Sequence, residues 1–396
     1  MARVLLMSTM ERGHTNPVVP VAQRLLRAGH TVGWLCIPQP GPQVRALGVE
    51  VLPFDPPPPP DHITGGPELA DLVRNEPRLH DWIKTLLLDA VPDQIEPVRR
   101  AMAAWRPDVV APDPMLYQGV IAAHLLGLPV ACISSSLNPI TPDGIDCPLS
   151  RTIASLTPQR QALFARYGVP ARFALCDWLA PRVNVVFSTP AYAGTIGLLR
   201  PGVQLVGPSI PAGARGDEPK MDWTKLDPSR PLVYASFGSQ IYHQPEIFMK
   251  IARATAHLGV QVLLVAGDLA RSSWAHSLPS HVVVVPYAPQ LQVLARARVF
   301  ITHGGANSVM ESLHAGVPLL QSPVCNDQWL QARFVQASGV GRVLDLSQAS
   351  VEQAASVLGE LLTESSSCRT ALAPVTASYR AMDGANRAAE LVVSGV

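Results

Sequence analysis

The chain has 396 residues, of which 47% are hydrophobic and 15% are charged, and its formal net charge is +1. This length predicts two domains, or three, and the hydrophobic content excludes a disordered chain. A net charge so close to zero argues against bulk attraction to nucleic acid or to an anionic membrane, and it suits an apolar partner or substrate.

The cysteines and the N-terminus indicate the compartment. Six cysteines are scattered through apolar stretches without a Cys-x-x-Cys pair, which is typical of reduced thiols and argues against a zinc ribbon. The sequence shows neither a secretory h-region nor an apolar run long enough to span a membrane. We therefore expect a soluble, cytoplasmic protein.

Short apolar runs alternate with helical patterns such as Pro17–Leu26 and Leu116–Leu126, which predicts parallel βαβ units. Two segments interrupt this series, the proline run Pro56–Pro60 and a long excursion over residues 134–180. Loops after strand ends line ligand crevices in such sheets, although plain solvent loops are the alternative for both segments. The predicted strands of this first half are Val4–Ser8, Val32–Ile37, Val49–Phe54, Val109–Ala111, Val130–Ile133 and Val183–Ser188.

The pattern lapses after Val206, where residues 207–230 have the Pro-, Gly-, Asp- and Lys-rich composition of a linker. A second α/β series then begins, with predicted strands at Leu232–Ser236, Val260–Val265, Val282–Val285, Val299–Thr302 and Leu319–Gln321. We predict two doubly wound α/β halves joined near residue 215, followed by a helical stretch over about residues 366–396.

Several motifs are absent from the sequence. It has no P-loop, no Gly-x-Gly-x-x-Gly after the first strand and no Gly-x-Ser-x-Gly nucleophile elbow, which argues against the enzyme classes that depend on them. It also has no Asp-x-Asp, so a carboxylate pair that holds a metal on a nucleotide diphosphate has no local source.

Two residues with useful chemistry follow predicted strands of the first half. His14 comes after the first strand, before a helix start predicted at Asn16-Pro17 with Asn16 as its N-cap, and Asp113 follows Val109–Ala111. Both are expected at the carboxyl edge of the sheet, where a carboxylate can orient an imidazole that acts as a general base. A surface histidine and a helix N-cap aspartate are the alternatives.

The second half has a Gly-rich strand-to-helix turn, Thr302-His303-Gly304-Gly305-Ala306-Asn307-Ser308. Backbone N–H groups at a helix N-terminus form an anion site, and His303, Asn307 and Ser308 add side-chain donors for a diphosphate. Glu311 lies one turn beyond Asn307 on the same helical face, where it can accept from two ribose hydroxyl groups.

Three further turns come after predicted strands. Phe237-Gly238-Ser239 is a turn of small residues. In a second turn, after Leu319–Gln321, Asp327 and Gln328 are adjacent in sequence and can bond several sugar hydroxyl groups. An aromatic residue at a strand end, Tyr287, can stack on a base, and Gln290 can bond the edge of that base.

Taken together, these motifs resemble the UDP-glycosyltransferase superfamily, the inverting family 1 enzymes, in its bacterial natural-product type. In the second half the resemblance runs from Pro286-Tyr287-Ala288-Pro289-Gln290 through His303-Gly304-Gly305 and Glu311 to Asp327-Gln328. In the first half it rests on Gly13-His14-Thr15-Asn16-Pro17 and Ala28-Gly29-His30-Thr31-Val32.

The resemblance implies a GT-B fold, in which two Rossmann-like doubly wound domains face each other across a cleft. It implies an acceptor-binding domain over residues 1–210, a linker over 211–230 and a nucleotide-sugar-binding domain over 231–375. A C-terminal helix over residues 376–396 is expected to return to the first domain.

The resemblance also implies the roles of individual residues. His14 is the expected catalytic base with Asp113 as its partner, and neither a metal nor a cofactor is expected besides the nucleotide-sugar donor, UDP-glucose. The implied donor-binding residues are Ser239, Tyr287, Ala288, Gln290, His303, Gly304, Gly305, Asn307, Ser308, Glu311, Asp327 and Gln328.

We therefore expect an inverting, metal-independent hexosyltransferase that moves glucose from UDP-glucose to a hydroxyl group of an apolar, polyketide-like small molecule. A monomer or homodimer is expected, without nucleic acid or membrane insertion. The alternatives are a dTDP-deoxysugar-dependent antibiotic glycosyltransferase, a carotenoid or glycolipid glycosyltransferase, and an auxiliary protein that binds a nucleotide sugar without catalysis. The sequence does not identify the acceptor.

Overall fold

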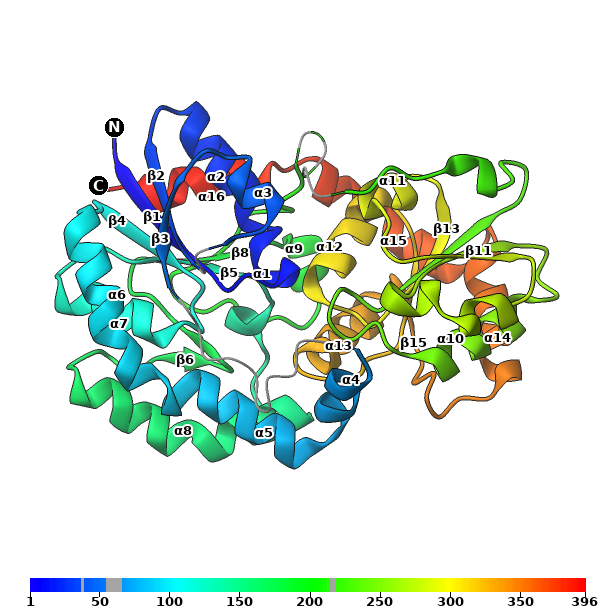
Figure 1. The fold of residues 1–396 in the computed structure, drawn as a ribbon, viewed down its shortest axis with the longest axis horizontal. Coiled ribbons are helices and arrows are strands. Elements are labelled where there is room, and N and C mark those ends of the chain that lie inside the picture. The colour runs from blue at the N-terminus through cyan, green and yellow to red at the C-terminus, as the bar shows by residue number, and fades with distance from the viewer. Residues whose placement is uncertain (37–38, 55–65, 212, 214, 216–217) are drawn as a thin grey trace. The chain divides into compact units, whose positions relative to one another are not determined.

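A computed structural model describes the chain apart from residues 37–38, 55–65, 212, 214 and 216–217 (Figure 1). The chain forms two compact α/β units, of which unit 1 comprises Met1–His62, Glu76–Asp217 and Met382–Val396. Unit 2 comprises Ile63–Asn75 and Glu218–Ala381. The proline run Pro56–Pro60 and part of the expected linker lie outside the described residues.

Unit 1 is built on two groups of parallel strands, in the orders β3-β2-β1-β4 and β5-β8-β9, joined by a bridge between Val110 and Val130. The order reverses between β1 and β4, which is the place where doubly wound sheets bind ligands. The strands are β1 (Arg3–Met7), β2 (Thr31–Cys36), β3 (Glu50–Pro53), β4 (Val109–Pro112), β5 (Ala131–Ser134), β8 (Val183–Val186) and β9 (Val203–Leu205).

Helices cover this sheet because its central strands are apolar on both faces: Val4, Leu5 and Leu6 of β1 are all fully buried. A π-helical turn at Thr85–Asp89 joins two of the helices, and a 3-10 turn lies at Asn138–Ile140. The helices are α1 (Arg12–Thr15), α2 (Val18–Arg27), α3 (Pro42–Arg45), α5 (Glu76–Lys84), α6 (Val91–Trp105), α7 (Tyr117–Leu125), α8 (Pro148–Arg166), α9 (Pro190–Ala193) and α16 (Gly384–Val393).

The excursion over residues 134–180 contains regular structure that the sequence patterns did not predict. It includes the long helix α8 and an antiparallel hairpin of β6 (Phe173–Ala174) and β7 (Asp177–Trp178). The helix starts at an unusual capping box, in which the Cys147 thiol accepts from the Ser150 N–H and the Ser150 hydroxyl accepts from the Cys147 N–H. A thiol is not among the usual capping groups, so the start of the helix was missed.

The predicted role of Asn16 as a helix N-cap is wrong. The chain forms the one-turn helix α1 directly after β1, and Asn16 is the C-cap of that helix, with its N–H donating to the Arg12 carbonyl. Pro17 instead occupies the N-cap position of α2. His14 therefore lies within a helical turn rather than in the loop before one.

Unit 2 has six parallel strands in the order β12-β11-β10-β13-β14-β15, again with one reversal, between β10 and β13. At this reversal, Tyr234 of β10 and Phe300 of β13 stack with their ring centroids 4.7 Å apart. The strands are β10 (Leu232–Ser236), β11 (Gln261–Val265), β12 (Val282–Val285), β13 (Ala297–Thr302), β14 (Leu319–Gln321) and β15 (Gly341–Val343).

The helices of unit 2 include one from the first half of the chain, α4, whose Arg74 donates to the Gln244 side chain. They are α4 (Gly66–Arg74), α10 (Pro245–Thr255), α11 (Gln290–Leu294), α12 (Ala306–Ala315), α13 (Gln328–Ser338), α14 (Val351–Leu362) and α15 (Ser367–Arg380). Shorter 3-10 turns lie at Trp223–Lys225, Gly267–Arg271 and Ser273–Ser277.

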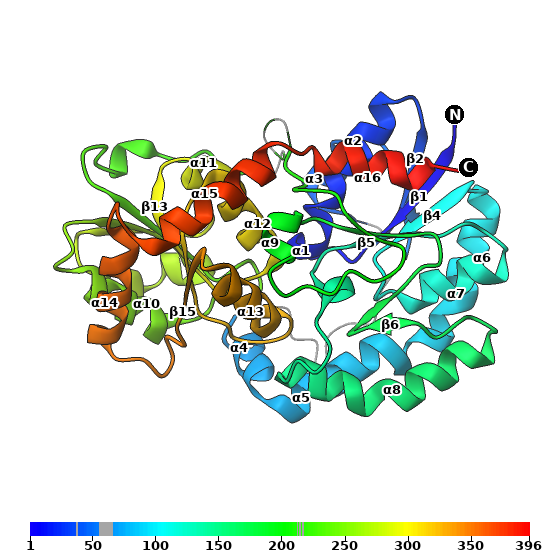
Figure 2. The same ribbon diagram turned by 180° about the vertical axis from the view of Figure 1, so that it is seen from behind.

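The C-terminal stretch forms two helices rather than one, and the second of them, α16, packs beside α2 in unit 1 (Figure 2). Asp383 caps α16 by accepting from the Asn386 N–H, and its carboxylate also pairs with Arg24 of α2 at 2.6 Å. At the other end of α16, Arg182 donates to the carbonyls of Leu391 and Val392. Polar contacts thus hold both ends of the helix.

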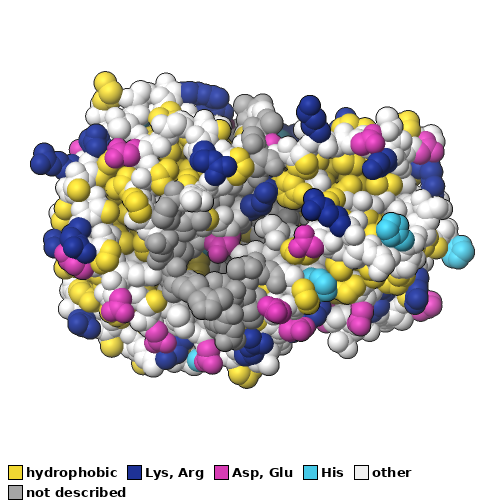
Figure 3. Space-filling model, in the orientation of Figure 1, with side chains coloured by type: hydrophobic (Ala, Val, Ile, Leu, Met, Phe, Trp, Pro, Cys, Tyr) yellow, Lys and Arg dark blue, Asp and Glu magenta, His cyan; other side chains and the backbone are white. Residues whose placement is uncertain are grey.

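Charged side chains of both signs are interspersed with hydrophobic ones on the face drawn in Figure 3. This agrees with the net charge of +1. In the part of the chain that the structure describes, no helix is both long enough and apolar enough to cross a bilayer.

We predict opposite effects for two glycine-to-alanine substitutions. A Cβ at Gly384 would lie 2.3 Å from the Gly207 carbonyl oxygen, so Gly384→Ala should destabilise the chain by about 1–3 kcal/mol. At Gly359 within α14, the nearest atom to such a Cβ is 4.0 Å away, so Gly359→Ala should stabilise the chain by about 0.5–1 kcal/mol. Urea unfolding followed by circular dichroism measures both. Wild-type stability of Gly384→Ala would contradict the close packing of α16.

Candidate active site

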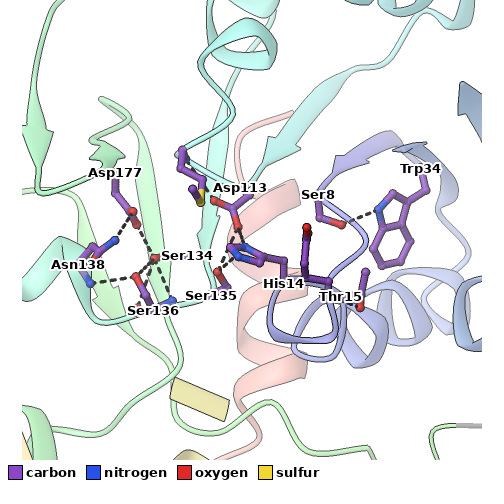
Figure 4. A network of polar contacts seen from close by, with 12 residues as sticks. Ser8, His14, Thr15, Trp34, Asp113, Ser134, Ser135, Ser136, Asn138 and Asp177 are labelled. Carbon is purple, nitrogen blue, oxygen red and sulfur yellow. Dashed lines mark hydrogen bonds and ion pairs between the residues drawn. The ribbon is translucent and has the colours of Figure 1, made fainter. Parts of the chain in front are cut away.

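The two chemically useful residues of the first half meet at the strand reversal of unit 1. His14 Nδ1 lies 2.6 Å from Asp113 Oδ2, with His14 supplied by α1 after β1 and Asp113 by the turn after β4 (Figure 4). The Asp113 N–H donates to the Met7 carbonyl at 2.8 Å, and the Met115 N–H donates to Asp113 Oδ1 at 3.2 Å. Backbone contacts therefore hold this carboxylate.

A general base must be accessible to its substrate, whereas the carboxylate that orients it can be buried, and the exposed fractions of the two side chains fit these roles. The Asp113 side chain is 5% exposed, whereas that of His14 is 26% exposed. Because Nδ1 faces a carboxylate, we assign the imidazole proton to Nδ1, which leaves the lone pair of Nε2 as the proton acceptor. Asp113 does not cap α7, which begins at Tyr117 with Leu116 in the N-cap position.

A third polar residue, Ser135, completes this pair and was not predicted from the sequence as a site residue. Its Oγ lies 2.9 Å from His14 Nδ1 and 3.1 Å from Asp113 Oδ2, to which it donates (Figure 4). Ser135 directly follows β5, the strand next to β4. The signal was present, because Ser135 stands at a strand end just as His14 and Asp113 do.

The turns after β10 and β13 lie together at the strand reversal of unit 2, and two glycines allow their close approach. Gly304 has φ +90°, and a Cβ there would lie 1.7 Å from Gln321 Nε2. Gly238 has φ +79°, and a Cβ there would lie 2.9 Å from His303 Cε1. Both positions therefore require glycine, because a side chain at either would collide with the neighbouring side chain and would have to adopt a left-handed backbone conformation.

His303 is held as a neutral side chain. Burial lowers its pKa from 6.5 to about 4, and a hydrogen bond with the Ser236 backbone opposes this shift only in part. Near neutral pH the imidazole therefore provides hydrogen bonding rather than a positive charge.

Gln290 holds the carboxylate of Glu311, which is 1% exposed. Gln290 Nε2 donates to Glu311 Oε2 at 2.8 Å and to Ser308 Oγ at 3.4 Å. The amide oxygen of Gln290 accepts from the Tyr234 hydroxyl at 3.1 Å. The side chain of Gln290 is thus engaged within the unit, and its expected contact with a base edge stays a prediction.

Gln328 is engaged in a similar way. Its amide oxygen accepts from the N–H groups of Val324 at 2.8 Å and of Cys325 at 3.1 Å, so the side chain braces the loop before α13. Asp327 is half-buried at the N-cap position of α13, without a capping hydrogen bond from its side chain. The predicted sugar contacts of both residues stay predictions.

The other predicted donor residues all lie in unit 2 near strand ends, and their roles are likewise untested. Ser239 is exposed, Tyr287, Gly305 and Asn307 are half-buried, and Ala288 is buried.

The six cysteines are buried free thiols. Among the described residues, histidine, cysteine, aspartate and glutamate do not gather in a group of three or more that is arranged to hold a metal ion.

A family comparison matches the second half of the chain. Residues 201–372 match the family described as UDP-glucoronosyl and UDP-glucosyl transferase. This match includes every residue of the predicted donor set in unit 2.

Two curated relatives extend the similarity to the whole chain. An uncharacterized UDP-glucosyltransferase of Bacillus subtilis, YojK, is 24% identical over 100% of this chain and 98% of its own length. The oleandomycin glycosyltransferase of Streptomyces antibioticus is 25% identical over 99% of this chain and 90% of its own length.

Solved structures confirm the expected GT-B fold. The kitacinnamycin glycosyltransferase has a TM-score of 0.77 and 23% identity, and the match covers 99% of this chain and 98% of that one. The Streptomyces sp. SF2575 glycosyltransferase SsfS6, in complex with thymidine diphosphate, has a TM-score of 0.68 and 20% identity, with 98% of each chain covered.

The lowered pKa of His303 predicts a pH-dependent stability. Because the folded pKa lies below 6.5, the stabilising contribution of neutral His303 is complete above pH 6.5 and is lost as the pH falls towards 4. Between pH 7.5 and 5, we expect His303→Asn to lose less unfolding free energy than wild type, by roughly 1–2 kcal/mol. Urea unfolding at both pH values tests this.

The control for this prediction is His257→Asn, because His257 is an exposed histidine of the same unit. Its pH dependence should equal that of wild type. A His303→Asn variant with the full wild-type pH dependence would show that His303 is not the group responsible.

Proposed function

Because the chain belongs to the UDP-glycosyltransferase superfamily, we propose that it is an inverting transferase that moves a hexose from a nucleotide diphosphate to a hydroxyl group of an apolar small molecule. The observation that carries this proposal is the hydrogen bond between the accessible His14 and the buried Asp113. This is the arrangement of a general base with an orienting carboxylate.

In the proposed reaction, His14 Nε2 takes the proton of the acceptor hydroxyl group. The acceptor oxygen attacks the anomeric carbon, the bond from that carbon to the phosphate oxygen breaks, and the nucleoside diphosphate leaves with the electron pair. Attack opposite to the leaving group inverts the anomeric centre. Asp113 stabilises the imidazolium that forms, because its Oδ2 accepts a hydrogen bond from Nδ1–H, with 2.6 Å between the two atoms. The carboxylate does not itself become protonated.

The donor is proposed to bind to unit 2. Backbone N–H groups at the start of α12, together with His303 and Asn307, suit the diphosphate, because an N-terminal helix end favours anions. Glu311 has one oxygen bonded to Gln290, and a carboxylate has further acceptor positions for ribose hydroxyl groups. These donors can stabilise the charge of the diphosphate through hydrogen bonds, and we propose metal independence on that basis.

We propose UDP-glucose as the donor because a carboxylate such as Glu311 is suited to a ribose diol. The competing donor is a dTDP-sugar, and one observation favours it: the related SsfS6 glycosyltransferase was solved with thymidine diphosphate. The proposed acceptor is a natural product, in line with the names of the oleandomycin and kitacinnamycin glycosyltransferases. The low net charge of +1 also suits an uncharged acceptor.

The catalytic proposal predicts that His14→Ala lowers kcat by at least about 100-fold, because the acceptor oxygen loses its base. Nucleotide binding should change little, since the proposed donor residues belong to unit 2 and His14 belongs to unit 1. Product formation followed by mass spectrometry and UDP titration by calorimetry measure the two properties separately.

Asp113→Asn should lower kcat less than His14→Ala does, because an amide still orients the imidazole although it does not stabilise its charge. Full turnover in His14→Ala together with lost UDP affinity would overturn the assignment of the base. It would favour the alternative of a protein that binds a nucleotide sugar without catalysis.

The donor proposal predicts that UDP-glucose has a kcat/KM about 5- to 150-fold higher than 2′-deoxy-UDP-glucose, because the deoxy donor leaves an acceptor of Glu311 unmatched. Glu311→Ala should reduce this ratio towards one. Competition between the two donors for one acceptor, followed by mass spectrometry, gives the ratio directly.

The matched control is Glu364→Ala, which removes an exposed carboxylate from the same unit and should keep the wild-type ratio. Equal specificity constants for the two donors in the wild type would refute the ribose role of Glu311. A preference for dTDP-glucose would then identify the competing donor.

A further inference from the structure

A second buried carboxylate, Asp177, lies close to the His14–Asp113 pair and has no part in the mechanism above. It is 2% exposed at the start of β7. The Ser134 hydroxyl donates to Asp177 Oδ2 at 2.5 Å, and the Asn138 amide donates to Oδ1 at 2.8 Å. Both oxygens are therefore held by side chains from the segment after β5.

The turn of three serines, Ser134–Ser136, connects Asp177 to the proposed base (Figure 4). Ser134 Oγ donates to Asp177 and accepts from the Ser136 N–H at 3.4 Å, which fixes the turn. The residue between them, Ser135, contacts both His14 and Asp113. Asp177 is thus linked to the His14–Asp113 pair through Ser134 and Ser135.

The hairpin that carries Asp177 is held in a strained shape. Leu175, in the two-residue turn between β6 and β7, has φ +49°, a conformation that costs a bulky residue about 1–3 kcal/mol. Buried Arg160 donates to the Leu175 carbonyl at 2.6 Å, and the Tyr117 hydroxyl donates to the Cys176 carbonyl at 2.6 Å. These two side chains fix the turn directly before Asp177.

The charge on Asp177 depends on the charges of His14 and Asp113. Burial, followed by repulsion from Asp113, raises the pKa of Asp177 to about 7, against the lowering effects of its hydrogen bonds and of His14. A proton on His14 therefore favours the ionised form of Asp177. The other titratable or charged groups around it are Tyr117, Arg160, Cys132 and Cys176.

We propose that Asp177 is a positioning residue for the His14–Asp113 pair: it holds Ser135 in place through the serine turn, and its negative charge stabilises protonated His14. This inference rests on the proposed function, in which His14 receives the proton of the acceptor. Asp113 alone orients the imidazole, whereas Asp177 adds charge at the step in which the imidazolium forms.

The test is Asp177→Asn, which keeps the size and an acceptor oxygen but removes the charge. We expect kcat to fall by about 3- to 30-fold while the KM values for donor and acceptor stay within about twofold. The acid limb of the kcat–pH profile should move to lower pH, because His14 becomes harder to protonate wherever Asp177 would be ionised.

The same shift is measurable without any substrate. Nuclear magnetic resonance of the His14 imidazole in the full-length protein should give a titration midpoint that is lower in Asp177→Asn than in wild type. Asp146→Asn is the matched control, because this exposed carboxylate pairs with a surface arginine, Arg151, and its removal is the same change in charge. It should leave both profiles at their wild-type values.

Thermal unfolding tests the raised pKa of Asp177 separately from its effect on His14. Since the folded pKa of Asp177 lies above its ordinary value, ionisation opposes folding increasingly as the pH rises from about 4 to 7. The Tm of Asp177→Asn minus the Tm of wild type should therefore be higher at pH 8 than at pH 5, by about 2 °C or more. An Asp177 with an ordinary pKa would instead show the same Tm difference at both pH values.

The proposal is overturned if Asp177→Asn is folded and shows wild-type kcat, pH profile and His14 titration. If that variant does not fold, Ser134→Ala replaces it, and this variant should lower kcat and shift the His14 titration in the same direction but less. Failure of the proposed function can be distinguished from failure of this inference. Even if the wild type has no transferase activity, the His14 titration midpoints of the wild type and of Asp177→Asn can still be compared. An unchanged midpoint there refutes the coupling by itself.

Discussion

A single reversal of strand order in each parallel sheet determines where this chain places its reactive groups. In unit 1 the reversal lies between β1 and β4, and it brings together His14 and Asp113, which are 99 positions apart in the sequence. In unit 2 it lies between β10 and β13, and it brings Gly238 against His303. Because side chains that follow adjacent parallel strands share an edge, one rule of topology generates both groups of polar residues.

Buried carboxylates recur around these reversals, and each is surrounded by hydrogen-bond donors. Asp113 accepts from backbone and side-chain donors, Asp177 accepts from Ser134 and an asparagine, and Glu311 accepts from Gln290. Removing such a charge from water is costly unless donors replace the water. The donors therefore have two effects: they lower the cost of burying the charge, and they fix the orientation of each carboxylate.

The sequence predicted what depends on local patterns and strand position. Runs such as Leu232–Ser236 are apolar because both faces of the strand are covered, and His14 and Asp113 were found because they follow such strands. Asn16 was misassigned because a short helix forms one turn earlier than its capping pattern indicated. Asp177 was missed because it lies within a tight antiparallel hairpin, and only tertiary contacts bring that hairpin to the site.

The position of α16 has a consequence for the order in which the chain folds during its synthesis. Unit 1 contains both the first residues of the chain and its last, Met382–Val396, while unit 2 closes at Ala381. Proteins are made from the N-terminus, and domains generally fold as units as they emerge. Here the segment Met382–Val396 of unit 1 is synthesised after the segments of unit 2, so the α2 surface that α16 covers is exposed until that segment has been made. Every segment of unit 2 can therefore fold before the contact between α2 and α16 forms.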